Sequence, residues 1–261
     1  MYERAKGAAA ASWPQVEDDF LDAMSRFDSG LAATYGVVLT DSDRTQLAAD
    51  VQNGKGDFFN DLLALLLENC AGIPNLYARR KVPGLIVRDH NLDGVYPETG
   101  RIEFLLEAKM MGTPRTARSP GQKPGGRPGS ADVGKRVREL AFKSIDLKGE
   151  YSRLRVAEGK LPTAGGPGGG DLTAWLRGVP PRIYCFMAVR VLSETDFQAT
   201  LRWARAAQQV LDAVGLYCYE PVAPDSLTRY RPRPDVPVEL QLERVLHKAC
   251  LDLQNLKPTQ T

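Results

Sequence analysis

Residues 92–109, LDGVYPETGRIEFLLEAK, decide the fold that this sequence predicts. The residues on either side of PETG, at 92–96 and 101–110, have the apolar and β-branched character of strands, and PETG itself is typical of a turn. The stretch therefore predicts a tight β-hairpin. Because FLL at 104–106 is apolar on both faces, the second strand should lie inside a sheet.

Three charged residues of this hairpin should lie close together. Side chains alternate between the two faces of a strand, so Glu107 and Lys109 are expected as neighbours on one face. The turn folds the first strand back along the second and brings Asp93 to them. Charges in this pattern on an exposed strand are common, but at the end of a buried strand they need a reason. Carboxylates bind Mg²⁺, and a lysine beside them can hold a water near a phosphate.

This pattern resembles that of the PD-(D/E)XK nuclease superfamily, which includes most type II restriction endonucleases. The matching segments are LDGV at 92–95 and LLEAK at 105–109, with Leu92 in place of the usual proline. The resemblance covers residues 57–110 at the level of motifs and, more loosely, the later order of strands and helices.

The resemblance implies a set of roles for the matching residues. Asp93 and Glu107 would bind Mg²⁺ with help from the carbonyl oxygen of Ala108, and Lys109 would position the attacking water. The reaction implied is hydrolysis of a phosphodiester that leaves a 5′-phosphate.

The chain before the hairpin predicts helices. Apolar residues recur at helical spacing over 16–37, a second helix should run from 40–42 to Val51, and a third should span 57–69. Many relatives carry a further carboxylate on the helix before the hairpin, and Glu68 is our candidate. The alternative is that Glu68 faces solvent at the end of this helix.

The later chain predicts alternating helices and strands. We expect a short strand at 85–87, helices at 131–154 and 194–214, strands at 182–192 and 216–219, and a C-terminal helix. The fold class is then α/β (α+β), a central mixed sheet flanked by helices with a restriction-endonuclease-like core. We expect one nuclease domain over 1–261, with an N-terminal helical part at 14–72, a catalytic core at 83–220 and a C-terminal helix at 238–256.

The composition excludes a protein that binds nucleic acid through a high overall positive charge. The formal net charge is only +2, so affinity for DNA must come from local patches. The four cysteines are far apart and form no zinc motif, which indicates buried thiols in a reducing cytoplasm. No segment has the length and hydropathy of a membrane span.

Basic residues cluster on both sides of the hairpin. The candidates for contacts with DNA are Arg79, Arg80, Lys81, Arg115, Arg118, Lys123, Arg127, Lys135 and Arg136. Most of the second group belongs to a Gly- and Pro-rich stretch at 113–134, which predicts a loop that closes on phosphates. A solvated linker is the alternative.

The sequence therefore predicts a Mg²⁺-dependent, sequence-specific endonuclease acting on double-stranded DNA, a type II restriction enzyme. Cutting both strands of a symmetric site favours a homodimer, and a cognate DNA methyltransferase is an expected partner. Two alternatives remain open. One is a repair, junction-resolving or modification-dependent nuclease of the same fold, and the other is a DNA-binding protein without catalysis.

Overall fold

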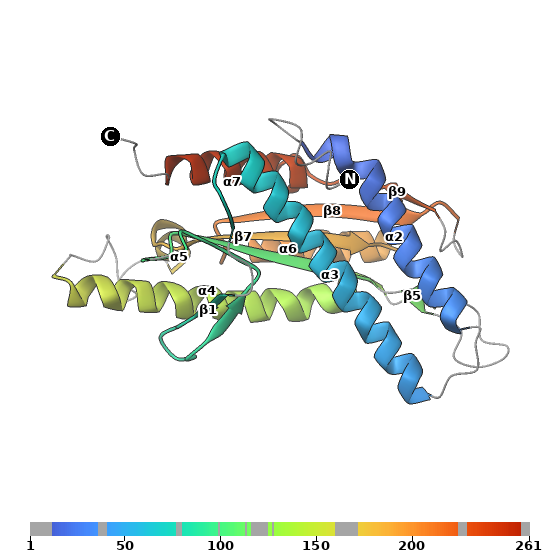
Figure 1. The fold of residues 1–261 in the computed structure, drawn as a ribbon, viewed down its shortest axis with the longest axis horizontal. Helices are drawn as coiled ribbons and strands as arrows, with labels where there is room; N and C mark the ends of the chain where they lie inside the picture. Colours follow the sequence, from blue (N-terminus) through green and yellow to red (C-terminus); the bar gives the residue numbers. More distant parts are fainter. Residues whose placement is uncertain are drawn as a thin grey trace.

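The computed structural model describes residues 12–35, 41–76, 80–98, 100–112, 114–115, 125–126, 128–159, 172–223 and 229–256. Within these residues the structure is a mixed β-sheet between two layers of helices (Figure 1). The expected mixed α/β class is therefore confirmed.

The central sheet has the order β3–β4–β7–β8–β9 in the described part of the chain. Its strands are β3 (Gly94–Tyr96), β4 (Phe104–Met111), β7 (Arg182–Arg190), β8 (Ala213–Pro221) and β9 (Tyr230–Pro232). The three middle strands are parallel, and β3 and β9 run antiparallel at the two edges. The middle strands are buried on both faces, as parallel strands covered by helices must be.

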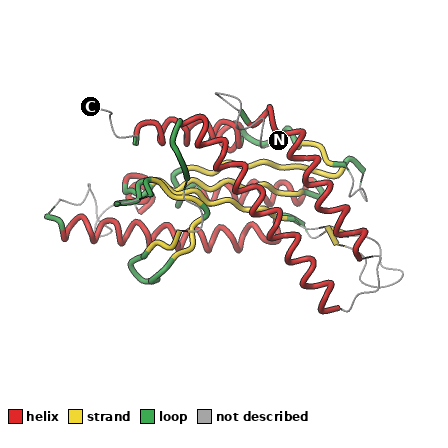
Figure 2. The backbone as a smooth tube through the Cα atoms, viewed as in Figure 1, coloured by secondary structure: helices red, strands yellow, loops and turns green. Residues whose placement is uncertain are grey.

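Helices pack on both faces of the sheet. One face carries α2 (Trp13–Tyr35), α3 (Asp41–Ala71) and α7 (Leu242–Asn255), and the other carries α4 (Ser130–Ala157) and α6 (Glu194–Ala207). Figure 2 shows α2 and α3 crossing the strands obliquely. Two hydrophobic cores result, one on each side of the sheet.

Smaller elements complete the described fold. A two-stranded sheet pairs β1 (Arg80–Val82) with β2 (His90–Leu92), and a second pairs β5 (Pro114–Arg115) with β6 (Gly125–Gly126). The short helix α5 (Leu172–Gly178) packs beside α4, and a 3₁₀ turn, η1 (Val238–Leu240), precedes α7.

Two sequence predictions near the site are wrong. The helices expected at 40–51 and 57–69 form one helix, α3, which continues through Asn53 and Gly54. Tertiary packing outweighs the weak helix propensity of this pair, because the next residue, Lys55, is buried against α2. The strand expected at 85–87 is instead the tip of the β1–β2 hairpin, where Leu85 and Ile86 are 52% and 75% exposed.

Boundaries later in the chain also differ. The helix expected at 194–214 ends at Ala207, because β8 begins at Ala213 rather than Leu216. Helix α5 and edge strand β9 were not predicted, since both are short. The apolar residues of 213–215 have no clear period, so the sequence leaves helix and strand unresolved there.

The expectation of four free thiols is wrong for two of the cysteines. Cys70 at the end of α3 and Cys250 on α7 form a disulfide, whereas Cys185 and Cys218 are free and buried. Two helices distant in the sequence meet at this bond, which a sequence without spacing motifs does not reveal. None of the helices in the described residues is long and apolar enough to cross a membrane.

Candidate active site

Strand β4 presents Glu107 and Lys109 on the face of the sheet that α4 covers. Its even-numbered residues, from Phe104 to Met110, belong to the core under α2, α3 and α7, while Leu105 belongs to the opposite core. By the alternation of a strand, Glu107 and Lys109 share the face of Leu105. The Glu107 side chain is 1% exposed, so its charge must be matched by neighbours.

The pairing of β3 with β4 places Asp93 beside these two residues. Gly94 pairs with Leu106, and continuing this antiparallel register by one residue sets Asp93 opposite Glu107. The two strands approach closely at Gly94, where an added Cβ would lie 3.1 Å from Cβ of Leu106. A side chain at position 94 would therefore require Leu106 to shift by a few tenths of an ångström.

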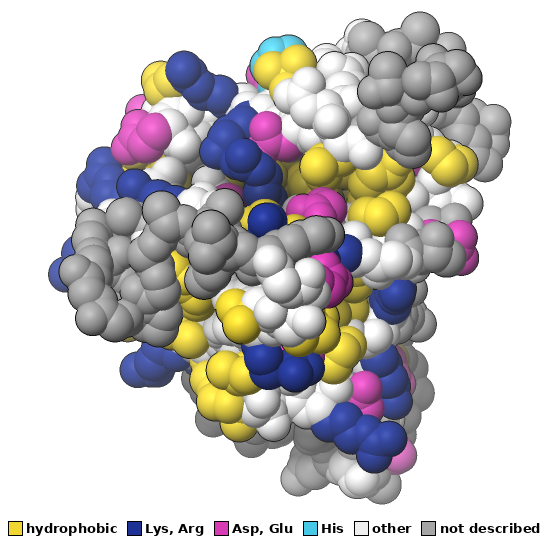
Figure 3. Space-filling model, turned by 90° about the vertical axis from the view of Figure 1, so that its left-hand side faces the viewer, with side chains coloured by type: hydrophobic (Ala, Val, Ile, Leu, Met, Phe, Trp, Pro, Cys, Tyr) yellow, Lys and Arg dark blue, Asp and Glu magenta, His cyan; other side chains and the backbone are white. Residues whose placement is uncertain are grey.

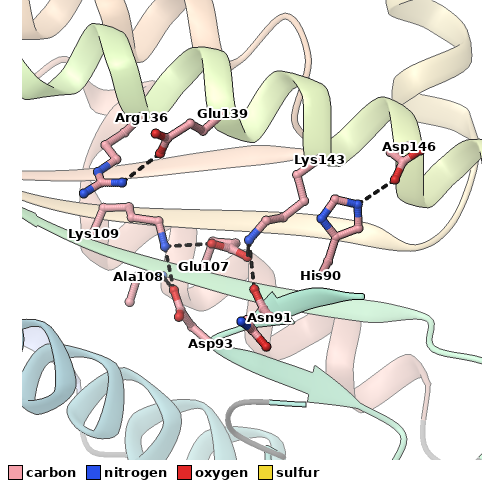
Figure 4. A network of polar contacts seen from close by, with 10 residues as sticks. All are labelled: His90, Asn91, Asp93, Glu107, Ala108, Lys109, Arg136, Glu139, Lys143 and Asp146. Atoms are coloured by element: carbon pink, nitrogen blue, oxygen red, sulfur yellow. Dashed lines mark hydrogen bonds and ion pairs between the residues drawn. The ribbon is translucent and has the colours of Figure 1, made fainter. Parts of the chain in front are cut away.

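Lys109 joins the two carboxylates. Its Nζ lies 2.7 Å from Oδ2 of Asp93 and 2.7 Å from Oε2 of Glu107 (Figure 4). The backbone N–H of Ala108 donates a further hydrogen bond of 2.9 Å to Oδ2 of Asp93. The three side chains that the sequence singled out thus converge on one point.

The electrostatics of this cluster keep Lys109 charged. Burial acts to lower the pKa of the Lys109 ammonium, but the negative charges of Glu107 and Asp93 outweigh it and hold the pKa above its ordinary value. In the metal-free protein the residue is therefore an ammonium that donates hydrogen bonds.

A cleft of about 530 Å³ opens over this cluster. Asp93, Ala108 and Lys109 form part of its wall, and α3 and α4 supply the polar side chains Asn60 and Arg136 on either side. The amide of Asn60 donates a hydrogen bond of 3.2 Å to the backbone carbonyl of Asp93, so α3 also fixes the backbone between β2 and β3.

The cluster has the donors that Mg²⁺ requires. Glu107 Oε2 and Asn60 Oδ1 are buried oxygens without an aligned hydrogen bond in the described residues, although Glu107 Oε2 has the ion pair with Lys109. No group of three or more acidic, His or Cys side chains that could hold a metal occurs in the described part of the chain. Mg²⁺ is nevertheless often bound by one or two carboxylates with waters and substrate phosphates, so the residues present fit this ion.

Glu68 does not reach the cleft. Its Oε1 accepts a hydrogen bond of 2.6 Å from the backbone N–H of Leu76, and burial raises the pKa of Glu68. Asn60 lies eight residues earlier on α3, about 12 Å along the axis at 1.5 Å per residue, and it is Asn60 that borders the cleft. Glu68 therefore anchors the segment after α3, and the prediction that it completes the site finds no support.

The basic candidates differ in their positions. Arg136 borders the cleft and bonds to Glu139, and Lys135 is exposed beside it. Arg80 contacts the carbonyl of Pro97, and Lys81 is exposed on β1.

Other basic candidates lie in parts of the chain about which the structure says less. Arg79, Arg118, Lys123 and Arg127 lie outside the described residues, as does half of the expected loop at 113–134, and for Arg115 only the backbone is described. On the face drawn in Figure 3, Lys and Arg side chains form separate groups among hydrophobic and neutral ones.

Sequence reasoning missed Lys143. From α4 it donates hydrogen bonds of 2.6 Å to Oε1 of Glu107 and 3.0 Å to the carbonyl of Asn91 (Figure 4). A signal was present in the sequence, because Arg136, Glu139 and Lys143 recur at spacings of three and four and so share one face of a helix. In the order of elements that helix follows the Glu-Ala-Lys strand after the short strands β5 and β6.

A buried contact between His90 and Asp146 fixes the β1–β2 hairpin, which precedes Asp93 in the chain. Nε2 of His90 lies 2.6 Å from Oδ2 of Asp146, and the two carboxylate oxygens also accept from the backbone N–H groups of Ile86 and Val87. His90 thus has a structural partner on α4.

No protein-family model matches the chain, and neither the comparison with curated proteins nor that with solved structures gives a match. The assignment of a function therefore depends on the geometry of the site and on the resemblance of its motif.

Proposed function

We propose that the protein is a Mg²⁺-dependent endonuclease for double-stranded DNA, with the site chemistry of PD-(D/E)XK nucleases. The observation that carries the proposal is the position of Lys109 Nζ, 2.7 Å from a carboxylate oxygen of both Asp93 and Glu107. Ionisable groups so tightly grouped at a cleft, on a buried strand, are typical of a functional site.

The order of elements supports the same proposal. Helix α3 precedes the hairpin, β4 carries the Glu-Ala-Lys motif, and α4 connects β4 to its parallel neighbour β7. This arrangement resembles the core expected from the motif. The Asn60 and Arg136 side chains at the cleft offer hydrogen-bond and charge contacts to a nucleic acid.

Each residue has a defined task in this proposal. Mg²⁺ would polarise the scissile phosphate and lower the pKa of a bound water. Asp93, Glu107 and the Ala108 carbonyl would hold the ion, and Lys109 would orient the attacking water by donating hydrogen bonds. Attack on phosphorus breaks the bond to the 3′ oxygen, so one product carries a 5′-phosphate and the other a 3′-hydroxyl.

Sequence specificity and a symmetric dimer complete the proposal. A homodimer would be the simplest way to cut both strands of a symmetric site, and a cognate methyltransferase would protect the host DNA. Arg136 at the cleft and the exposed Lys135 next to it in the sequence, both at the start of α4, could contact the backbone of the duplex.

The experiment that tests this function is digestion of phage DNA by the purified protein in Mg²⁺, with EDTA in a parallel sample. We expect discrete fragments in Mg²⁺ alone, with 5′-phosphate ends that ligase joins without prior phosphorylation. Intact DNA in Mg²⁺, from both methylated and unmethylated sources, would contradict the proposal.

A further inference from the structure

Lys143 gives the site a second ammonium that the proposed chemistry does not require. Its side chain is 20% exposed and extends from α4 to within 2.6 Å of Oε1 of Glu107, whereas Lys109 lies 2.7 Å from Oε2. In the metal-free protein, Asp93 and Glu107 contribute two negative charges, and Lys109 and Lys143 two positive charges. The four side chains are therefore neutral as a group.

Lys143 makes the two carboxylates less favourable for a metal ion than they would be with Lys109 alone. A divalent cation that enters beside the two carboxylates changes the net charge of the group from zero to +2. Lys143 repels that cation at close range in a partly dehydrated site, where charge interactions are only weakly screened. The same excess positive charge attracts an anion.

Lys143 does not depend on Glu107 alone for its position. Its Nζ also donates to the carbonyl of Asn91, two residues before Asp93 on the hairpin. This neutral acceptor and the rigid helix α4 keep the ammonium in the site when the charge of Glu107 is shared with a metal ion.

From these contacts we infer that Lys143 weakens the binding of Mg²⁺ to the free protein and strengthens the binding of DNA phosphate, so that the metal site fills mainly when DNA is bound. The inference deepens the proposed function and rests on it for the identity of the ligands. The positive charge of Lys143 would then be offset by the negative charge of the bound phosphate.

The test is the variant Lys143→Met, which keeps the length of the side chain and removes its charge. Binding of Mg²⁺ and of Ca²⁺ without DNA is measured by calorimetry, and binding of a short duplex without metal by fluorescence anisotropy over a range of salt. We expect metal affinity to rise by about tenfold, the order expected when one charge is removed at contact distance. We expect DNA affinity to fall and its salt slope to flatten by about 0.9.

These opposite changes separate the inference from a structural role. If Lys143 merely holds Glu107 in place, metal affinity falls in Lys143→Met, and that result overturns the inference, as does unchanged affinity for metal. Lys143→Gln, which keeps hydrogen-bond donors, is measured in parallel, with thermal unfolding of both variants. Arg153→Met is the matched control, because it removes an exposed charge from α4 ten residues away, about 15 Å along the helix.

Failure of the proposed function would look different. Wild-type protein that binds metal and DNA with the expected effects of Lys143→Met, yet never cleaves, would contradict the nuclease proposal and leave this inference intact. If the wild type cleaves DNA and Lys143→Met has the same metal affinity as the wild type, the nuclease proposal stands and the inference about Lys143 is wrong.

Discussion

The backbone N–H of Ala108 donates a hydrogen bond of 2.9 Å to Oδ2 of Asp93. In an extended strand the N–H and C=O of one residue point to the same side, so the Ala108 carbonyl also faces Asp93. Strand β3 pairs with β4 only as far as Leu106, which leaves that side of Ala108 without a strand partner. The backbone of one residue, Ala108, thus orients Asp93 through its N–H and offers through its carbonyl the oxygen expected as a third metal ligand.

The two carboxylates should be essential for cleavage and dispensable for binding. Asp93→Asn and Glu107→Gln keep the side-chain shapes and remove the charges that hold Mg²⁺. Loss of metal assistance worth several kcal/mol corresponds to a fall in cleavage rate of more than about 10²-fold. Duplex binding should persist, because removal of a negative charge lessens repulsion of phosphate. Cleavage at the wild-type rate by either variant would exclude this site.

Asn60 should matter for activity and Glu68 should not. Asn60 fixes the carbonyl of Asp93 and borders the cleft, whereas Glu68 caps the N–H of Leu76. Asn60→Ala should slow cleavage by about 10-fold or more, the effect typical of residues that orient metal ligands. Glu68→Gln should leave the cleavage rate within about twofold of wild type, with DNA binding as the common control. The reverse order of effects would restore the original prediction for Glu68.

Asp146 should stabilise the fold in a pH-dependent way. Burial acts to raise the pKa of Asp146, but hydrogen bonds from His90, Val87 and Ile86 outweigh it and hold the pKa below its ordinary value. A carboxyl whose folded pKa is depressed contributes stability above its unfolded pKa, near 4, and that contribution is lost as pH falls through the folded pKa.

Asp146→Asn tests this contribution. We expect it to lower the free energy of unfolding by at least about 2 kcal/mol at pH 7, the value of a buried hydrogen bond to a charged group. Urea denaturation from pH 7 to pH 3 should show the gap between wild type and variant closing below about pH 4. A gap that stays constant over this range would contradict the assignment.

The position of α3 should depend on a buried ion pair. Nζ of Lys55 lies 2.9 Å from Oδ1 of Asp28 on α2, both side chains are fully buried, and Tyr230 donates to the other oxygen of Asp28. Lys55→Met should destabilise the protein by about 3–5 kcal/mol in urea denaturation, because a buried carboxylate loses its partner. The exposed Lys135→Met serves as control. A loss below about 1 kcal/mol would mean that Asp28 does not need this charge.

Much of the fold near the hairpin could be predicted from the sequence because local signals agreed there. The PETG turn and the FLL run gave an interior strand, and β4 does lie between β3 and β7. The prediction failed where packing outweighs propensity. Asn53 and Gly54 are typical of a helix end, yet α3 continues through them because Lys55 and Phe59 pack beneath it.

The candidate site likewise has some residues that the sequence predicted and others that it did not. Strand alternation and the hairpin turn were enough to bring Asp93, Glu107 and Lys109 together. Lys143 and Asn60 come from helices whose rotation about their own axes is set by packing in the two cores. The sequence of the motif does not determine that rotation. Glu68 was a candidate because it lies on the helix before the hairpin, and that place in the sequence does not reveal which side of α3 meets the hairpin.

The most direct test of the central claim is single-turnover cleavage of one defined duplex at saturating Mg²⁺ by wild type, Lys109→Ala and Lys109→Arg. Duplex binding by all three is measured without metal. We expect Lys109→Ala to bind DNA and cleave at least about 10²-fold more slowly, as for loss of a positioned catalytic group. Lys109→Arg should not restore the rate, because a planar guanidinium does not fit the place of a compact ammonium between Asp93 and Glu107. Equal cleavage rates for the three proteins would contradict the account.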